Sequence, residues 1–279
     1  MFCTGNLLDK VIHVINKYLF ENQIDVTNYY DSMINNFDKD LNLEIGNPLS
    51  IENLNFSFQK LLSKKIDISN IGIDFPVFFD NPNEIKNRIM IIAMDPKRNG
   101  QIHNQITLNS VFSVHSKKNG RETNKNDYWN FIEPLTKNNF VYITDVYKLY
   151  YEFNLEDGLN LRHKLSNKDP EFIVKKTEAY NQNKLILEKE INIVKPNKII
   201  SLGNESATAL KSIMNINTNE LFFEQEQIEY IFMPHISRTV TQSIPTIANL
   251  FISLGKLNSN DTFLEVGKKI HELRKKLYS

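Results

Sequence analysis

The sequence predicts an α/β fold, a three-layer α/β/α domain with a central four-stranded parallel sheet, together with a helical N-terminal extension. The first observation is the run Ile89–Met94, six apolar residues in a row, which is typical of a strand buried on both faces. The second is that strand and helix patterns alternate at least three times along the core, as a helix-covered parallel sheet requires. The third is that three of these strands lead into polar residues suited to chemistry, namely Asp95, Asp145 and His235.

The composition predicts an ordinary globular protein. The 279 residues are 41% hydrophobic and 24% charged, and 33 basic residues balance 33 acidic ones, so any surface for nucleic acid must be a local patch. The single cysteine, Cys3, argues against disulfides, cysteine-ligated zinc and iron–sulfur clusters, and we expect neither metal nor cofactor. No apolar run reaches membrane-spanning length, and Asp9 and Lys10 interrupt the first apolar segment. We therefore expect a soluble, cytoplasmic protein without a signal peptide or membrane contact.

Residues 1–80 are predicted to form the helical extension, packed on a core domain that comprises residues 81–279. The spacing of apolar residues in the extension follows the 3.6-residue period of amphipathic helices. Gly and Pro then interrupt the pattern near its end. The predicted elements are helices over 6–20, 26–38 and 51–64, followed by a loop from Gly72 to Pro82.

The core domain is predicted to begin with a strand over 88–94, which Pro96 stops. A long polar loop follows, with the apolar island Val111–Val114 and the basic turn Lys117–Arg121 inside it, before Asp127 caps a helix. The other predicted strands cover 140–144, 198–202 and 228–233, and the other predicted helices cover 169–194, 205–214, 244–256 and 262–277.

Five segments between about residues 88 and 256 resemble, in order, the motifs of the uracil-DNA glycosylase superfamily. Ala93-Met94-Asp95-Pro96 resembles the Gly-Gln-Asp-Pro water-activating motif, and Val111–Val114 resembles the segment that carries the phenylalanine under the flipped base. Val141–Lys148 resembles the strand that ends in a base-reading asparagine, Lys195–Gly203 resembles a structural strand of the family, and His235-Ile236-Ser237 resembles its His-Pro-Ser motif. The resemblance implies a divergent member without an iron–sulfur cluster.

The implied activity is that of a monofunctional DNA glycosylase, which hydrolyses the N-glycosidic bond of a flipped-out base and leaves an abasic site. This reaction develops positive charge on the sugar and negative charge on the base. The Asp95 carboxylate would stabilise the sugar and activate water, and His235 would donate a hydrogen bond to the departing base. Phe112 would stack on the base. The remaining implied contacts are to the base from Met94, Lys97 and Asp145 and to DNA from Arg98, Ser237, Arg238 and Thr239.

Two departures from the family pattern concern the target base. Lys97 stands where an aromatic barrier usually lies beside the base C5, and a flexible cation would not exclude a bulky substituent. Asp145 stands where the uracil-reading asparagine usually lies, and its carboxyl could accept from the N4 donor of cytosine. Protonated through burial, it would donate to cytosine N3, although it would equally donate to uracil O4. We therefore predict that the target is a 5-substituted cytosine of phage DNA. The predicted role is antiviral defence.

Several alternatives stay open from the sequence. The chain could be a uracil-DNA glycosylase of base-excision repair that acts on DNA damage, or a catalytically inactive nucleic-acid-binding protein on the same fold. An unrelated hydrolase or nucleotide-binding protein is disfavoured, because Gly-x-Ser-x-Gly, P-loop and Gly-x-Gly-x-x-Gly motifs are missing. Asp95 could simply cap a loop, His235 could be a core histidine, Phe112 could be plain core, and His103 and His115 have possible auxiliary roles. In either glycosylase case the expected partner is DNA, and the expected state is a monomer.

Overall fold

The computed structural model describes residues 1–21, 24–37, 39, 49–62, 67–80, 87–94, 106–121, 127–154, 160–162, 178–218, 220 and 222–233. The predicted helices over 244–256 and 262–277 lie outside these residues, as do the first nine residues of the predicted helix 169–194.

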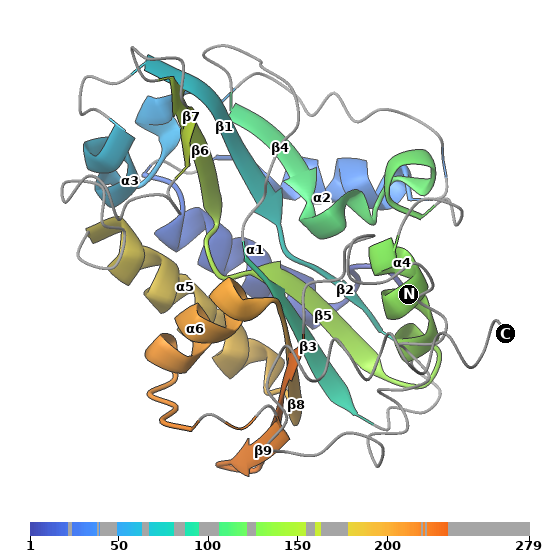
Figure 1. The fold of residues 1–279 in the computed structure, drawn as a ribbon. Coiled ribbons are helices and arrows are strands. Elements are labelled where there is room, and N and C mark those ends of the chain that lie inside the picture. Colours follow the sequence, from blue (N-terminus) through green and yellow to red (C-terminus); the bar gives the residue numbers. More distant parts are fainter. Residues whose placement is uncertain are drawn as a thin grey trace, which may run out of the picture.

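Helices and strands alternate through the described part of the chain (Figure 1). The helices are α1 (Asn6–Tyr18), α2 (Val26–Asn35), η1 (Ile51–Asn53), α3 (Phe56–Leu62), η2 (Val111–Ser113), η3 (Lys117–Arg121), α4 (Asp127–Thr136), α5 (Glu178–Val194) and α6 (Asn204–Ile213). The strands are β1 (Asp67–Phe75), β2 (Val77–Phe79), β3 (Arg88–Ala93), β4 (Ile106–Ser110), β5 (Phe140–Asp145), β6 (Leu149–Asn154), β7 (Asn160–Arg162), β8 (Lys198–Leu202), β9 (Phe222–Gln225) and β10 (Ile228–Met233).

The main sheet has six strands in the order β2-β5-β3-β8-β10-β9. The neighbours β5, β3, β8 and β10 run parallel to one another, whereas β2 and β9 pair antiparallel at the two edges. The four predicted strands are therefore present and parallel, and the predicted α/β class is confirmed. The prediction of a four-stranded sheet is too small, because two short antiparallel strands extend it.

A second sheet, in the order β4-β1-β6-β7, was not predicted. The predicted loop from Gly72 to Pro82 is wrong over 72–75, which belong to β1, and over 77–79, which form β2, and the predicted polar loop is wrong over β4. Gly72 lies in the middle of β1, opposite Thr107 of β4 and Tyr150 of β6. Pairing on both sides outweighs the weak strand preference of glycine, and such long-range pairing leaves no local pattern.

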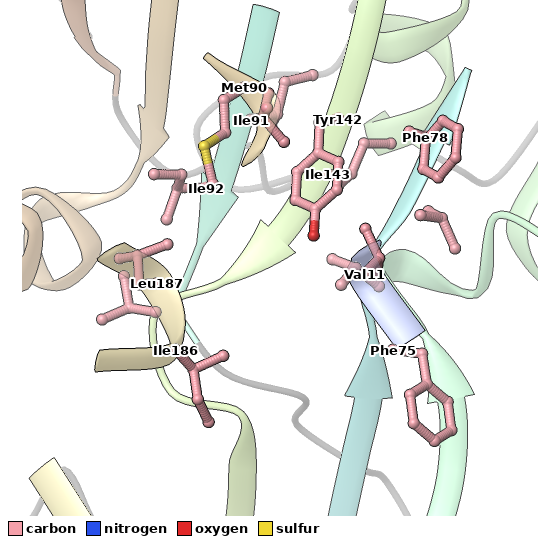
Figure 2. Close-up of a cluster of buried hydrophobic side chains, with 14 of the residues drawn as sticks. Val11, Phe75, Phe78, Met90, Ile91, Ile92, Tyr142, Ile143, Ile186 and Leu187 are labelled. Carbon is pink, nitrogen blue, oxygen red and sulfur yellow. The ribbon is translucent and has the colours of Figure 1, made fainter. Parts of the chain in front are cut away.

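The core between the main sheet and the helices is apolar, as the wholly apolar strands predict. Met90, Ile91 and Ile92 on β3 and Val141 to Ile143 on β5 are all fully buried. Figure 2 shows Tyr142 among these side chains, with its hydroxyl directed toward the region between Val11 of α1 and Ile186 of α5. The Tyr142 hydroxyl therefore lies inside the core, where Glu190 of α5 is near enough to add to the raised pKa of this tyrosine.

The chain's first residues pair with the edge of the main sheet. Phe2 forms an antiparallel bridge with Phe79, and the Cys3 amide donates to the carbonyl oxygen of Phe78 over 2.9 Å. The ring of Phe2 stacks on Phe37, with ring centroids 4.3 Å apart. These contacts, together with α1 packed against α5, tie the first helices to the core elements. The division into an extension of residues 1–80 and a domain of residues 81–279 stays a prediction.

Three buried groups near this edge make stability sensitive to alkaline pH. Burial raises the pKa of the Cys3 thiol from 9.0 to about 12, and burial raises the pKa of Tyr30 and Tyr142 well above 10.0. A raised folded-state pKa gives stability that is complete below the unfolded-state pKa and is lost as pH rises toward the folded value. We expect the free energy of unfolding to fall by about 1.4 kcal/mol per pH unit for each group, from pH 9 upward for Cys3 and from pH 10 upward for Tyr30 and Tyr142.

Urea unfolding at pH 8, 9, 10 and 11 measures this loss. The Cys3→Ala variant serves as the control, because it removes the group that titrates first. Its stability should stay level between pH 9 and 10 and fall only above pH 10. A wild-type chain equally stable at pH 8 and pH 11 would contradict the expectation.

Gly120 allows η3 to lie against η2. A Cβ atom at this position would be 1.8 Å from the carbonyl oxygen of Ser113, which is backbone and cannot rotate away. We expect Gly120→Ala to destabilise the protein by about 3 kcal/mol, through overpacking. Gly5→Ala is the contrast, because a Cβ there meets no atom within 4 Å and only the backbone conformation of φ 81° and ψ −173°, which residues other than glycine rarely adopt, adds a cost of about 1–3 kcal/mol. Thermal unfolding of both variants should rank them in this order.

Candidate functional site

The candidate site lies where the parallel strands of the main sheet end. In the register of the sheet Ala93 of β3 is opposite Asp145 of β5, and Met233 of β10 is opposite Leu202 of β8. The carboxyl ends of all four strands therefore share one edge. Asp95 follows β3 by two residues and His235 follows β10 by two residues, so the chain leads into both candidate catalytic residues from this edge.

The strand order also marks one position along this edge. From β3 the chain goes on to β5 on one side, and from β8 it goes on to β10 on the other side. The neighbours β3 and β8 therefore form a topological switch point, the place where open α/β sheets bind their ligands. The strands β3 and β10 flank β8 and are about 10 Å apart, two strand spacings. The two chain segments that lead to Asp95 and His235 thus leave the sheet beside the switch point.

The end of β3 is held by hydrogen bonds from two directions. The Val146 amide donates to the carbonyl oxygen of Ala93 over 2.9 Å, and the Tyr147 amide donates to that of Met94 over 3.0 Å. On the other side the Ser206 hydroxyl, in the first turn of α6, donates to the carbonyl oxygen of Ile92 over 3.1 Å. The backbone that enters the predicted catalytic motif is therefore fixed both to the turn after β5 and to α6.

Of the predicted site residues, the structure describes three. Met94 follows β3 directly and Asp145 ends the neighbouring strand β5, so the sheet places the two positions close together, and Asp145 is 2% exposed while Met94 is half-buried. Phe112 lies in η2, which contacts β5. The other predicted site residues lie outside the described part of the chain, and they are Asp95, Lys97, Arg98, His235, Ser237, Arg238 and Thr239.

Phe112 is presented by a strained turn. Its φ of 57° lies in the left-handed region, which bulky residues rarely adopt, and Ser113 follows with φ 55°. The ring stacks on Tyr128 of α4, with centroids 4.0 Å apart and planes 11° apart. It is only half-buried, so the alternative of a plain core phenylalanine does not describe it fully. Tyr128 is a neighbour of Phe112 that the sequence alone did not indicate.

His115, an auxiliary candidate, has a structural role in the same turn. Its Nδ1 atom lies 2.6 Å from the Ser110 hydroxyl oxygen, and its backbone amide donates to that same oxygen over 3.3 Å. Both side chains are buried, with 3% and 0% exposed. The pair closes the turn that carries Phe112.

A buried charged cluster contacts the backbone of Asp145. The Lys148 ammonium donates to Oε2 of Glu190 over 2.6 Å and to the carbonyl oxygen of Asp145 over 2.6 Å, and it also donates to the Thr144 hydroxyl. Lys148 is 1% and Glu190 0% exposed. Burial raises the pKa of Glu190 above 4.5, against the opposing effect of the Lys148 charge. The negative charge of Glu190 in turn adds to the effect of burial on the pKa of Tyr142.

The sequence contained a signal for this cluster that was missed. The buried residues of α5 recur at helical spacing, and two of them, Asn183 and Glu190, are polar. A charged residue on an apolar stripe needs a buried partner. Lys148, three residues after Asp145 at the end of a buried strand, is that partner.

The comparisons with known proteins give no family assignment. No protein-family model matches the sequence, and no curated protein matches it either. Within the described ranges no group of three or more His, Cys, Asp or Glu side chains could hold a metal ion. No helix in the described part of the chain has both the length and the apolar character needed to cross a membrane.

Proposed function

We propose that this chain is a monofunctional DNA glycosylase that releases a flipped-out, 5-substituted cytosine from phage DNA and leaves an abasic site. The observation that carries the proposal is the common edge of the parallel sheet. Segments leading to Asp95 and His235 leave this edge beside the switch point, and β5 ends there in Asp145. An acid for the sugar, a donor for the leaving base and a base-reading group are the three elements that the reaction needs.

The finer fold that accompanies this proposal is the three-layer α/β/α arrangement. The connection from β3 to β5 runs toward the β2 edge, while those from β5 to β8 and from β8 to β10 run toward the β9 edge. Right-handed connections in opposite directions place their helices on opposite faces. In the view of Figure 1, α5 and α6 lie to one side of β3 and β5, and α4 lies to the other side, as this rule predicts.

In the proposed mechanism Asp95 stabilises the positive charge on the sugar and orients a water molecule for attack at its C1′ carbon. His235 donates a hydrogen bond to the base oxygen that gains negative charge as the bond breaks. The Phe112 ring already has Tyr128 on one face, so a flipped base stacks on the other face. Asp145 contacts the base edge, with Met94 beside it and Lys97 leaving room at C5. The DNA backbone is held by Arg98, Ser237 and Arg238, with Thr239 at the gap in the duplex.

The test is base release by the purified chain from four matched duplexes and their single strands. Each contains one cytosine, 5-hydroxymethylcytosine, glucosylated 5-hydroxymethylcytosine or uracil, and abasic sites are detected by alkaline strand cleavage. The expected result is cleavage at the substituted cytosines. Efficient cleavage at uracil alone would replace the cytosine target by uracil repair. Binding without cleavage of any duplex or strand would instead indicate an inactive DNA-binding protein.

A further inference from the structure

We propose that Lys148 is a positioning residue for Asp145, and that Glu190 holds Lys148 in place for this purpose. The proposal presupposes the proposed function, in which Asp145 reads the base. It assigns a role to a buried ion pair that the reaction itself does not use.

The hydrogen bonds of Lys148 account for its whole donor capacity. An ammonium group has three donors, and here they reach Glu190, the carbonyl oxygen of Asp145 and the Thr144 hydroxyl. The Thr144 hydroxyl in turn lies 3.1 and 3.2 Å from the two carboxylate oxygens of Glu190. A charged donor therefore fixes the carbonyl of Asp145, and a second charge fixes that donor.

The backbone of Lys148 is held by the same helix. Its amide donates to Oδ1 of Asn183 over 2.8 Å, and Nδ2 of Asn183 donates to the carbonyl oxygen of Ala179 over 2.9 Å. Both Asn183 and Glu190 belong to α5, so one helix holds this residue at two points. The turn after Asp145 is thus fixed to α5 on one side and, through the amides of Val146 and Tyr147, to the end of β3 on the other.

Stability alone does not explain a charged pair at this depth. Removing two charges from water costs more than their attraction commonly returns, and well-packed apolar residues of similar volume often serve at least as well. A fixed charged donor does hold a carbonyl in one place, because its hydrogen bond is short and strong. In this protein that carbonyl belongs to the residue whose side chain is to read the base.

The double variant Lys148→Met with Glu190→Leu separates positioning from folding. It replaces both charges by apolar side chains of similar size, so the melting temperature should stay within about 5 °C of the wild-type value. The matched control is Lys184→Met with Glu188→Leu, which makes the same changes at a partly exposed pair on α5, 3.8 Å apart.

Three readouts report the position of Asp145. Hydrogen exchange at the amides of residues 145–148 should be about tenfold faster in the double variant, because the turn loses its charged anchor on the carbonyl of Asp145 and keeps only backbone amide bonds. Single-turnover base release should fall about 100-fold, as expected for a misplaced contact group. The ratio of the rates on substituted cytosine and on uracil should also change, which a loss of folded protein would not cause. The control should leave all three quantities unchanged.

Each outcome decides one of the two proposals. A double variant with wild-type exchange at 145–148, or with faster exchange but an unchanged rate and base ratio, overturns the positioning role. If the wild type releases no base from any of the DNAs, the proposed function fails, and anchoring is judged by exchange alone. Should the double variant not fold, Thr144→Val replaces it. This variant removes the hydroxyl that links Lys148 to Glu190, so exchange at residues 145–148 should be about threefold faster. Unchanged exchange in Thr144→Val would then overturn the positioning role of Lys148.

Discussion

Replacing Asp95 with asparagine is expected to lower the single-turnover rate of base release by about 10³-fold, within the range typical of a lost catalytic carboxylate. The amide keeps the size and shape of the side chain but carries no negative charge. It can neither stabilise the cationic sugar nor accept a proton from water. DNA binding should be retained, because the variant removes negative charge near the phosphates.

The measurement is the rate with enzyme in excess over a duplex that carries the best substrate from the four-duplex assay. Asp9→Asn on the exposed side of α1 is the matched control and should leave the rate unchanged. The melting temperature of Asp95→Asn should match the wild-type value. A variant that keeps a rate within threefold of wild type would remove Asp95 from the mechanism.

Breaking the buried ion pair from one side is expected to destabilise the protein by about 3–5 kcal/mol. In Glu190→Leu the Lys148 ammonium stays in the core without its counter-charge. In Lys148→Met the Glu190 carboxylate is left in the core without its own. Both side chains are at most 1% exposed, so water cannot replace the lost partner. The two single variants should therefore unfold at much lower urea concentrations than the double variant.

The pH dependence of Lys148→Met provides a further check with a definite sign. Burial already raises the pKa of Glu190, and the variant removes the charge that opposed this effect. A carboxyl whose folded-state pKa is raised gives stability that is complete below its unfolded-state value near 4.5 and is lost as pH rises. The deficit of Lys148→Met relative to wild type should therefore shrink as pH falls from 7 to 5. A deficit that stays constant would show that Glu190 is not charged at neutral pH.

The strands that the sequence predicted correctly share one physical property. Those that form the parallel centre of the main sheet are short, mainly apolar runs whose residues are nearly all buried, so their composition distinguishes them. The missed strands β1 and β4 carry glycine, asparagine and threonine and are stabilised by partners far away in the chain. Local patterns cannot report such pairing, and the second sheet was therefore missed.

The candidate site also contains contacts that local sequence patterns could predict and contacts that they could not. The meeting of Met94 and Asp145 was predictable, because neighbouring parallel strands end at one edge. The stacking of Phe112 on Tyr128 was not, since it depends on a left-handed turn that no residue of that segment favours. Glu190 was predictable in principle from the stripe of α5, but its partner on another element was not.

The edges of the two sheets have a consequence for self-association. In the main sheet the outer strands β2 and β9 have three and four residues, and Phe2 already pairs beside β2. In the second sheet β7 has three residues, and Leu49 bridges to Ile106 of β4. A neighbouring copy would therefore find only short stretches of unpaired backbone on which to add a strand. The described edges thus offer little template for the edge-to-edge growth that starts aggregation.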